Sequence, residues 1–115
     1  MEKKGQINIS EEVIADIAGH AAVESYGVVG MTRRKLKDGI AELLGKENIS
    51  KGIEVVLLDA GHVSIDLFLV VSFETKINEV AHNVMNKVKY SVENITGLSV
   101  QTVNINIQGV RVEEK

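Results

Sequence analysis

The chain has 115 residues, 44% hydrophobic and 25% charged, which fits one globular domain over residues 1–115 with its own core. Its net charge of −3 gives no general attraction to nucleic acid or anionic lipid, so such binding would need a local basic patch. The absence of cysteine excludes disulfides, thiolate catalysis and cysteine-bound zinc. No signal-peptide pattern or membrane-length apolar run is present, so we expect a cytoplasmic protein without direct membrane insertion.

The beginning of the chain predicts a strand followed by a helix. Residues 5–9 alternate around Ile7 and Ile9, as in a short strand. Ser10 is a good N-cap, and the apolar residues after it recur at helical spacing. Gly27 and Gly30 bracket two valines and are expected to end that helix.

A second helix is expected over residues 32–44, where Leu36, Ile40, Leu43 and Leu44 fall on one side. Its first turns carry four cations, which oppose the helix dipole at that end. They are Arg33, Arg34, Lys35 and Lys37. This basic run either marks a contact for an anion or nucleic acid, or is simply a solvated group of charges.

The longest and most apolar strand candidate covers residues 62–74, in which every odd position from 63 to 73 is apolar. Residues 53–58 form the strand before it. A three-residue turn that ends at Gly61 in left-handed conformation would pair Leu57 with Val63. That register brings the odd apolar positions of both strands to one face.

A third and longest helix is predicted from Asn78 to just before Gly97, a residue suited to a helix end. The last strand begins near Leu98. Its alternation of apolar and polar residues changes phase twice, which predicts β-bulges near Gln101 and at Gly109.

The predicted order is β-α-α-β-β-α-β. It indicates an α+β fold, a two-layer sandwich with a mixed or antiparallel sheet and helices on one face. The other sheet face is expected to be open. Its centre would show Val56, Leu58, Phe68 and Val70 among polar residues, a pattern typical of a surface that binds a partner or a second copy.

No group of residues indicates catalysis, a cofactor or a metal. Asp16, His20 and Glu24 share one side of the first helix, but three ligands in one line cannot surround an ion. Weak pairing on the helix surface explains them better. No nucleophile motif and no phosphate-binding glycine pattern is present, so we expect a protein that is not an enzyme.

One pattern suggests nucleic acid: Gly27-Val28-Val29-Gly30 is a G-x-x-G between two predicted helices. KH modules clamp a nucleic-acid backbone with such a loop, and one KH class shares the predicted element order. The basic run that follows favours this alternative. The two valines in the loop, the 3% aromatic content and the negative net charge oppose it.

Three stretches resemble the alkaline shock protein (Gls24-type) family of Gram-positive bacteria. Residues 5–31, GQINISEEVIADIAGHAAVESYGVVGM, resemble its N-terminal signature. Residues 38–45, DGIAELLG, and 96–110, TGLSVQTVNINIQGV, resemble its middle and its end. The resemblance implies a non-enzymatic cytoplasmic protein of the cell-envelope stress response. Because some members self-associate and are held at the membrane by a separate anchor protein, it also implies a homo-oligomer with a protein partner.

The sequence thus leads to two functional hypotheses. The first is a scaffold or interaction protein of the envelope stress response that self-associates or docks a partner through its open sheet face, with Phe68 at the centre of that face. The second is a KH-like RNA-binding module that uses residues 27–30 and the basic run. No cofactor is expected for either.

Overall fold

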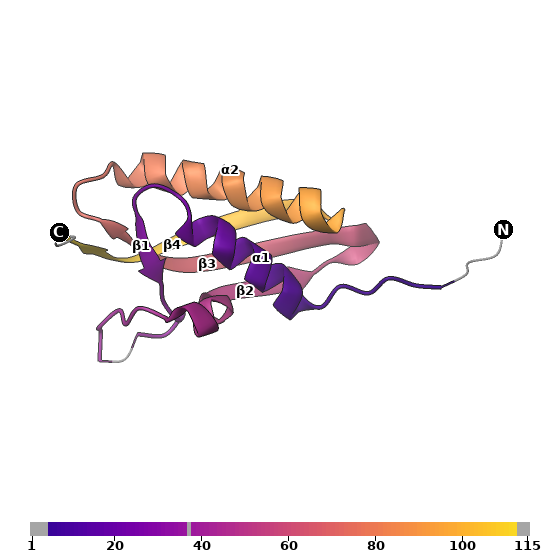
Figure 1. The fold of residues 1–115 in the computed structure, drawn as a ribbon, viewed down its shortest axis with the longest axis horizontal. Coiled ribbons are helices and arrows are strands. Elements are labelled where there is room, and N and C mark those ends of the chain that lie inside the picture. Colours follow the sequence, from indigo (N-terminus) through magenta and orange to yellow (C-terminus); the bar gives the residue numbers. More distant parts are fainter. Residues whose placement is uncertain (1–4, 37, 113–115) are drawn as a thin grey trace.

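The computed structural model describes residues 5–36 and 38–112. Two α-helices lie on one face of a four-stranded sheet (Figure 1). The helices are α1 (Glu11–Val23) and α2 (Ile77–Thr96), and the strands are β1 (Val28–Met31), β2 (Ile53–Leu57), β3 (His62–Ser72) and β4 (Ser99–Arg111). Two short 3-10 helices, η1 (Lys46–Gly52) and η2 (Asp59–Gly61), precede β2 and β3. The predicted α+β sandwich with helices on one face is confirmed, and its sheet is mixed.

β3 is the central strand and is paired on both edges. β4 runs parallel to it along one edge, from His62 to Ser72. β1 and β2 are antiparallel to β3 and share its other edge, β2 near the start and β1 near the end. The odd positions of β3 point toward the helices and are fully buried: Val63, Ile65, Leu67, Leu69 and Val71. α2 makes the crossover that the parallel β3–β4 pair requires.

Both predicted caps of the helices are present. The Ser10 hydroxyl accepts a hydrogen bond from the Val13 amide at 3.2 Å, which begins α1. Gly97 ends α2 in left-handed conformation, with φ 79°. The buried side of α1 is rich in alanine and that of α2 consists of valines, so both helices can lie close to the sheet.

The hairpin and both irregularities of the last strand are confirmed. Leu57 pairs with Val63 across η2, and Gly61 has φ 76°. The register of β4 against β3 shifts twice. The first shift leaves Gln101 of β4 without a partner on β3, and the second leaves Gln108 without one. The second bulge therefore lies immediately before Gly109, where the change of phase predicted it.

The predicted first strand, over residues 5–9, is wrong. The segment is extended but pairs with no strand of the described chain, and it leads away from the sheet (Figure 1). Ile9 packs against the core, whereas the Ile7 side chain is 92% exposed. Two alternating isoleucines do not make a strand when no sheet edge lies alongside to complete the hydrogen bonds.

The predicted second helix is also wrong, because residues 33–36 and 38–45, hereafter the covering loop, belong to no helix. Strand-type hydrogen bonds of 2.8 Å hold both ends, from the Thr32 amide to the Phe68 carbonyl and from the Leu44 amide to the Met31 carbonyl. Asp38 and Gly39 have φ of 54° and 74°, which no α-helix allows. The hydrogen bonds of Thr32 and Leu44 to the sheet thus outweigh the helix that the spacing of four leucine and isoleucine side chains favours.

Gly52 brings η1 against β1 at a close approach. A Cβ at this position would lie 2.6 Å from the Thr32 carbonyl oxygen and 3.0 Å from the Met31 Cβ. Gly52→Ala should therefore lower the free energy of unfolding by about 1–3 kcal/mol, the usual cost of overpacking. Urea denaturation measures this change.

Gly45→Ala is the matched control, because no atom lies within 4 Å of a Cβ there and its φ of −71° suits alanine. Its effect should stay within about 0.5 kcal/mol. Equal, small effects of the two substitutions would contradict the close approach at Gly52.

Candidate interaction surface on the sheet

The sheet face that points away from α1 and α2 is hereafter the outer face. The strand register sets its rows: β2 contributes Glu54 and Val56, β3 contributes Ser64, Asp66, Phe68 and Val70, and β4 contributes Thr102, Asn104 and Asn106. No helix of the described chain lies on it. Of the four side chains that the sequence assigned to a contact surface, Val56, Phe68 and Val70 belong to this face and Leu58 follows β2 directly, but their exposure differs.

The centre of the outer face is polar and internally hydrogen-bonded. The hydroxyls of Ser64 and Thr102 are 2.5 Å apart, and the Asn104 amide donates to the Asp66 carboxylate at 2.6 Å. The Asn106 amide donates to a β3 carbonyl at 3.1 Å. These cross-strand pairs hold the side chains of β3 and β4 in register.

The covering loop crosses part of the outer face and is attached to strands on both sides. The Gln108 side-chain amide donates to the carbonyls of Arg33 and Arg34, at 3.0 and 2.9 Å. Arg111 donates to the Ala41 carbonyl. On the β2 side, the Arg34 guanidinium pairs with Glu54 at 2.7 Å, and because both groups are well exposed this pair contributes less than about 1 kcal/mol.

Phe68 and Val70 lie under this loop, so their predicted exposure is wrong. Phe68 is 7% exposed, and the Arg34 guanidinium stands 5.8 Å from its ring centroid. Val70 has no exposed surface. The apolar part of the outer face at Phe68 and Val70 is therefore covered by the chain itself.

Two glycines allow the loop to come this close. Gly30 and Gly109 are the neighbours of Val70 on β1 and β4. A Cβ at Gly109 would lie 3.6 Å from the Ala41 Cβ, and one at Gly30 would lie 3.0 Å from a Leu43 methyl. Glycine on the two strands beside an apolar residue was the sequence signal that something covers Val70.

The other two predicted contact residues are exposed. Val56 and Leu58 are 54% and 40% exposed, at the end of the outer face farthest from the covering loop. Leu57, between them in the sequence, pairs with Val63 and therefore belongs to the helix side of the sheet. The exposed apolar surface of this face is therefore smaller than predicted and lies next to the β2–β3 turn.

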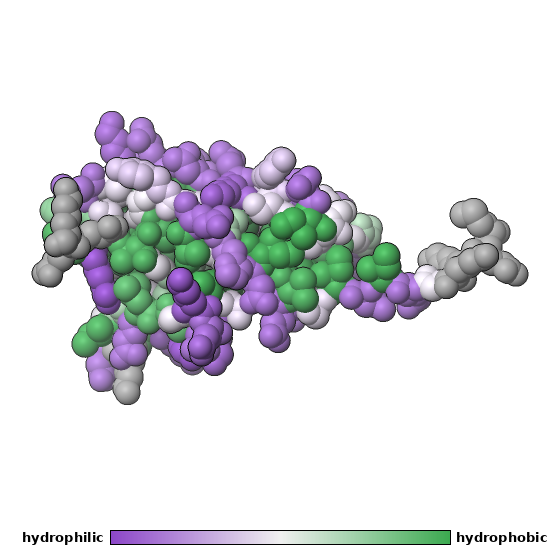
Figure 2. Space-filling view, in the orientation of Figure 1, coloured by the Kyte–Doolittle hydropathy of each residue, from purple (hydrophilic) through white to green (hydrophobic). Residues whose placement is uncertain are grey.

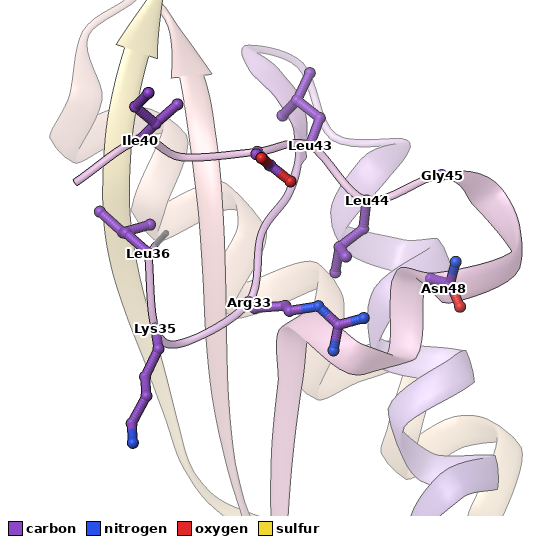
Figure 3. Close-up of a pocket in the computed structure, with 9 residues that line it drawn as sticks. Arg33, Lys35, Leu36, Ile40, Leu43, Leu44, Gly45 and Asn48 are labelled. Atoms are coloured by element: carbon purple, nitrogen blue, oxygen red, sulfur yellow. The ribbon is translucent and has the colours of Figure 1, made fainter. Parts of the chain in front are cut away.

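The covering loop carries the basic residues and a small cavity of about 290 Å³ (Figure 3). Arg33, Leu36 and Ile40 are among the residues that line it. In Figure 3 the Arg33 side chain passes below Leu44, whereas Lys35 points away from the other side chains. Arg33 and Lys35 are exposed, and Lys37 lies outside the described residues.

The G-x-x-G stretch is not a loop between helices. Val28 and Gly30 belong to β1 and pair with Val71 and Val70 of β3. Gly27 has φ 88°, and a Cβ there would lie 2.5 Å from a Val80 methyl of α2. These residues form part of the packed sheet, so the basis of the KH-like reading is wrong.

On the helix side, Figure 2 shows apolar surface in two areas with polar surface between them. A groove between α1 and α2 is lined by the apolar residues Ile17, Ala21 and Ile95 and by the polar residues Asp16, His20, Glu24 and Ser91. Glu24 pairs with Lys87 of α2 at 3.6 Å. The described residues contain no cluster of three acidic or histidine side chains that could hold a metal.

The model of the alkaline shock protein 23 family, described as having a cell envelope-related function, matches residues 1–112. The chain belongs to this family. The uncharacterized protein YloU of Bacillus subtilis (strain 168) is 54% identical, with 96% of this chain and 92% of that protein covered. Spy1614 of Streptococcus pyogenes serotype M6 is 40% identical, with coverage of 96% and 91%. The resemblance to the alkaline shock family is thus confirmed, and members occur in two Gram-positive genera.

Solved structures with a similar fold include two forms of the MamM CTD. A cadmium form has a TM-score of 0.51 at 12% identity, with 91% of this chain and 100% of that chain covered. A copper form has a TM-score of 0.52 at 12% identity, with 87% and 98% covered. At this identity the likeness concerns the fold alone. None of the helices in the described ranges has the length and apolar character needed to cross a membrane.

Phe68 should contribute to stability as a buried residue does. Phe68→Ala is expected to lower the free energy of unfolding by about 3 kcal/mol, because it opens a cavity between the sheet and the covering loop. Val56→Ala, at an exposed position of the same face, should cost less than about 1 kcal/mol. Urea denaturation of both variants measures the two changes in the free energy of unfolding. A negligible change for Phe68→Ala would contradict the burial of Phe68 under the covering loop.

Proposed function

We propose that this member of the alkaline shock protein family is a non-enzymatic scaffold or interaction protein of the cell envelope that docks a partner protein on its outer face. The observation that carries the proposal is the exposed pair Val56 and Leu58, on a sheet face without a helix in the described chain. Family membership supports the link to the envelope. We propose the alkaline or general stress response as its setting, as the family resemblance implies.

Val56 and Leu58 can act as apolar anchors. Full burial of an aliphatic side chain contributes roughly 1.5–3 kcal/mol, and a large part of both side chains is still exposed. Beside them, the hydroxyls of Ser64 and Thr102 already bond to each other. A partner that covers this region therefore removes water from apolar groups without leaving these hydroxyls unpaired.

The covering loop extends the same face with a different chemistry. Ile40 and Leu43 are 61% and 39% exposed, and the cavity beside them is lined by the exposed cations Arg33 and Lys35 and by one exposed carboxylate, that of Glu42. Acidic groups on the partner would complement these cations and speed its association. The partner that fits best has an apolar contact opposite Val56 and an acidic rim opposite the loop.

We infer a cytoplasmic location with attachment to the membrane through that partner. A membrane-anchored protein with a cytoplasmic segment of the chemistry just described would hold the protein at the envelope. This inference follows the family's described role and needs no membrane-inserted segment of this chain.

Substitution of both anchors should remove docking. A photoreactive amino acid at position 58 in living cells is expected to crosslink the partner, which mass spectrometry identifies. The purified partner should then bind the double variant Val56→Glu with Leu58→Glu at least tenfold more weakly than the wild type, because two carboxylates would be buried in an apolar contact. Isothermal titration calorimetry measures both affinities.

A matched control lies on α2. Tyr90 and Ile95 are 69% and 65% exposed, so Tyr90→Glu with Ile95→Glu adds the same charge to exposed apolar positions of the helix side. This control should bind the partner normally. Loss of binding in the α2 variant together with normal binding of the outer-face variant would refute the proposed surface.

A further inference from the structure

β4 has a free edge. It pairs with β3 on one edge along its thirteen residues, and no other strand of the described chain pairs with it. α2 packs above it but does not replace a strand (Figure 1). Toward its end β4 contacts the covering loop through Gln108 and Arg111, whereas residues 102–107 have no strand of the described chain on their outer edge.

This edge lacks most of the features that normally prevent strand pairing. From Ser99 to Val110 the sequence contains no charged residue and no proline. Natural proteins usually place lysine, proline or bulges on such edges. Here only the two bulges, at Gln101 and Gln108, interrupt it, and they leave a regular stretch over residues 102–107.

An open groove of about 460 Å³ follows this regular stretch. Its helix side is formed by Ala81 and Met85 of α2 with Val103 and Ile105 of β4. Its outer side is formed by Asn104 and Asn106 of β4 together with Arg34, Asp66 and Phe68. Ala81, Met85 and Ile105 are only partly buried. The groove thus offers an apolar layer on one side of the strand, and on the other side the asparagine amides of β4 beside Arg34, Asp66 and Phe68.

We propose that β4 pairs with β4 of a second copy in antiparallel orientation, around a two-fold axis at Ile105. Residues that face each other in an antiparallel pair point to the same side of the sheet. A pairing centred on Ile105 satisfies this condition: Ile105 faces its own copy, Asn104 faces Asn106, and Val103 faces Ile107. The paired stretch, residues 103–107, lies entirely between the two bulges.

A second copy fits this edge because the edge is self-complementary. On the outer side, Asn104 and Asn106 each donate one amide N–H to β3, and the second N–H and the amide oxygen remain to donate to and accept from the amide that faces them. On the helix side, isoleucine and valine meet isoleucine, and the small Ala81 leaves room above them. No like charges oppose one another, and the two-fold axis closes the contact as a dimer rather than a fibre.

The two copies would share one continuous sheet, with their helices on the same side. Val56 and Leu58 lie on β2 and next to it, on the far side of β3 from β4. They would stay exposed in this dimer. The dimer therefore goes beyond the proposed docking function, and either can fail without the other.

Sedimentation equilibrium of the full chain tests the dimer. The wild type should dimerise, and Ile105→Lys should raise the dissociation constant at least tenfold, because it places two ammonium groups opposite each other at the axis. Val112→Lys, beyond the end of β4 at a position that is 68% exposed, adds the same charge and should change nothing. A wild type that stays monomeric up to millimolar concentration overturns the proposal.

Because Ile105→Lys could also weaken the fold, a crosslinking experiment gives an independent test. The chain has no cysteine, so Ile105→Cys introduces a single thiol, and its copy should lie about 5 Å away between Cβ atoms. Mild oxidation or a short thiol crosslinker should give a covalent dimer in high yield. Gln101→Cys, outside the paired stretch, should give little, and equal yields from the two variants overturn the proposed register.

Discussion

The pairing of β3 on both edges is the constraint on which the rest of the structure depends. Five odd-numbered side chains of this strand have no exposed surface, and they can be buried only if helices cover that side completely. α2 supplies the cover and, at the same time, the crossover that lets β4 run parallel to β3. β1 and β2 then share the remaining edge. Part of the connection between them, the covering loop, crosses the outer face and is held there by hydrogen bonds from Gln108 and Arg111 of β4.

Local patterns predicted much of this fold, because several of its elements are set by neighbouring residues. The β2–β3 register follows from a short turn and alternation, the end of α2 follows from Gly97, and the bulges of β4 follow from changes of phase. Long-range pairing decided the elements that the sequence did not predict. Residues 32–44 have a helical spacing of apolar side chains, yet Thr32 and Leu44 both hydrogen-bond to the sheet, and their distant partners cannot be seen in a sequence window.

In the candidate surface, too, local patterns predicted one part and long-range contacts decided the rest. Alternation correctly placed Val56, Phe68 and Val70 on one sheet face, since that assignment needs only the period of a strand. Alternation does not reveal whether another segment crosses the face. Gly30 and Gly109 carried the missing information, because a position without a side chain on both neighbouring strands permits a close approach of the backbone. Apolar residues on an uncovered face therefore indicate a contact surface only when the connecting segments are too short to fold over them.

The two proposed surfaces have a geometric relation that follows from the sheet alone. In a dimer joined at β4, the strand order across the shared sheet would be β2, β3, β4 and then the same strands of the second copy in reverse. With neighbouring strands about 4.8 Å apart, the two β2 strands would lie roughly 24 Å from each other. Both outer faces would point in the same direction, because the two-fold axis is perpendicular to the sheet. A partner present in two copies could then bind at both ends of one surface, and the second contact would form at the high effective concentration that the first provides. Such a dimer would bind a membrane-attached partner tightly even if each contact through Val56 and Leu58 were weak.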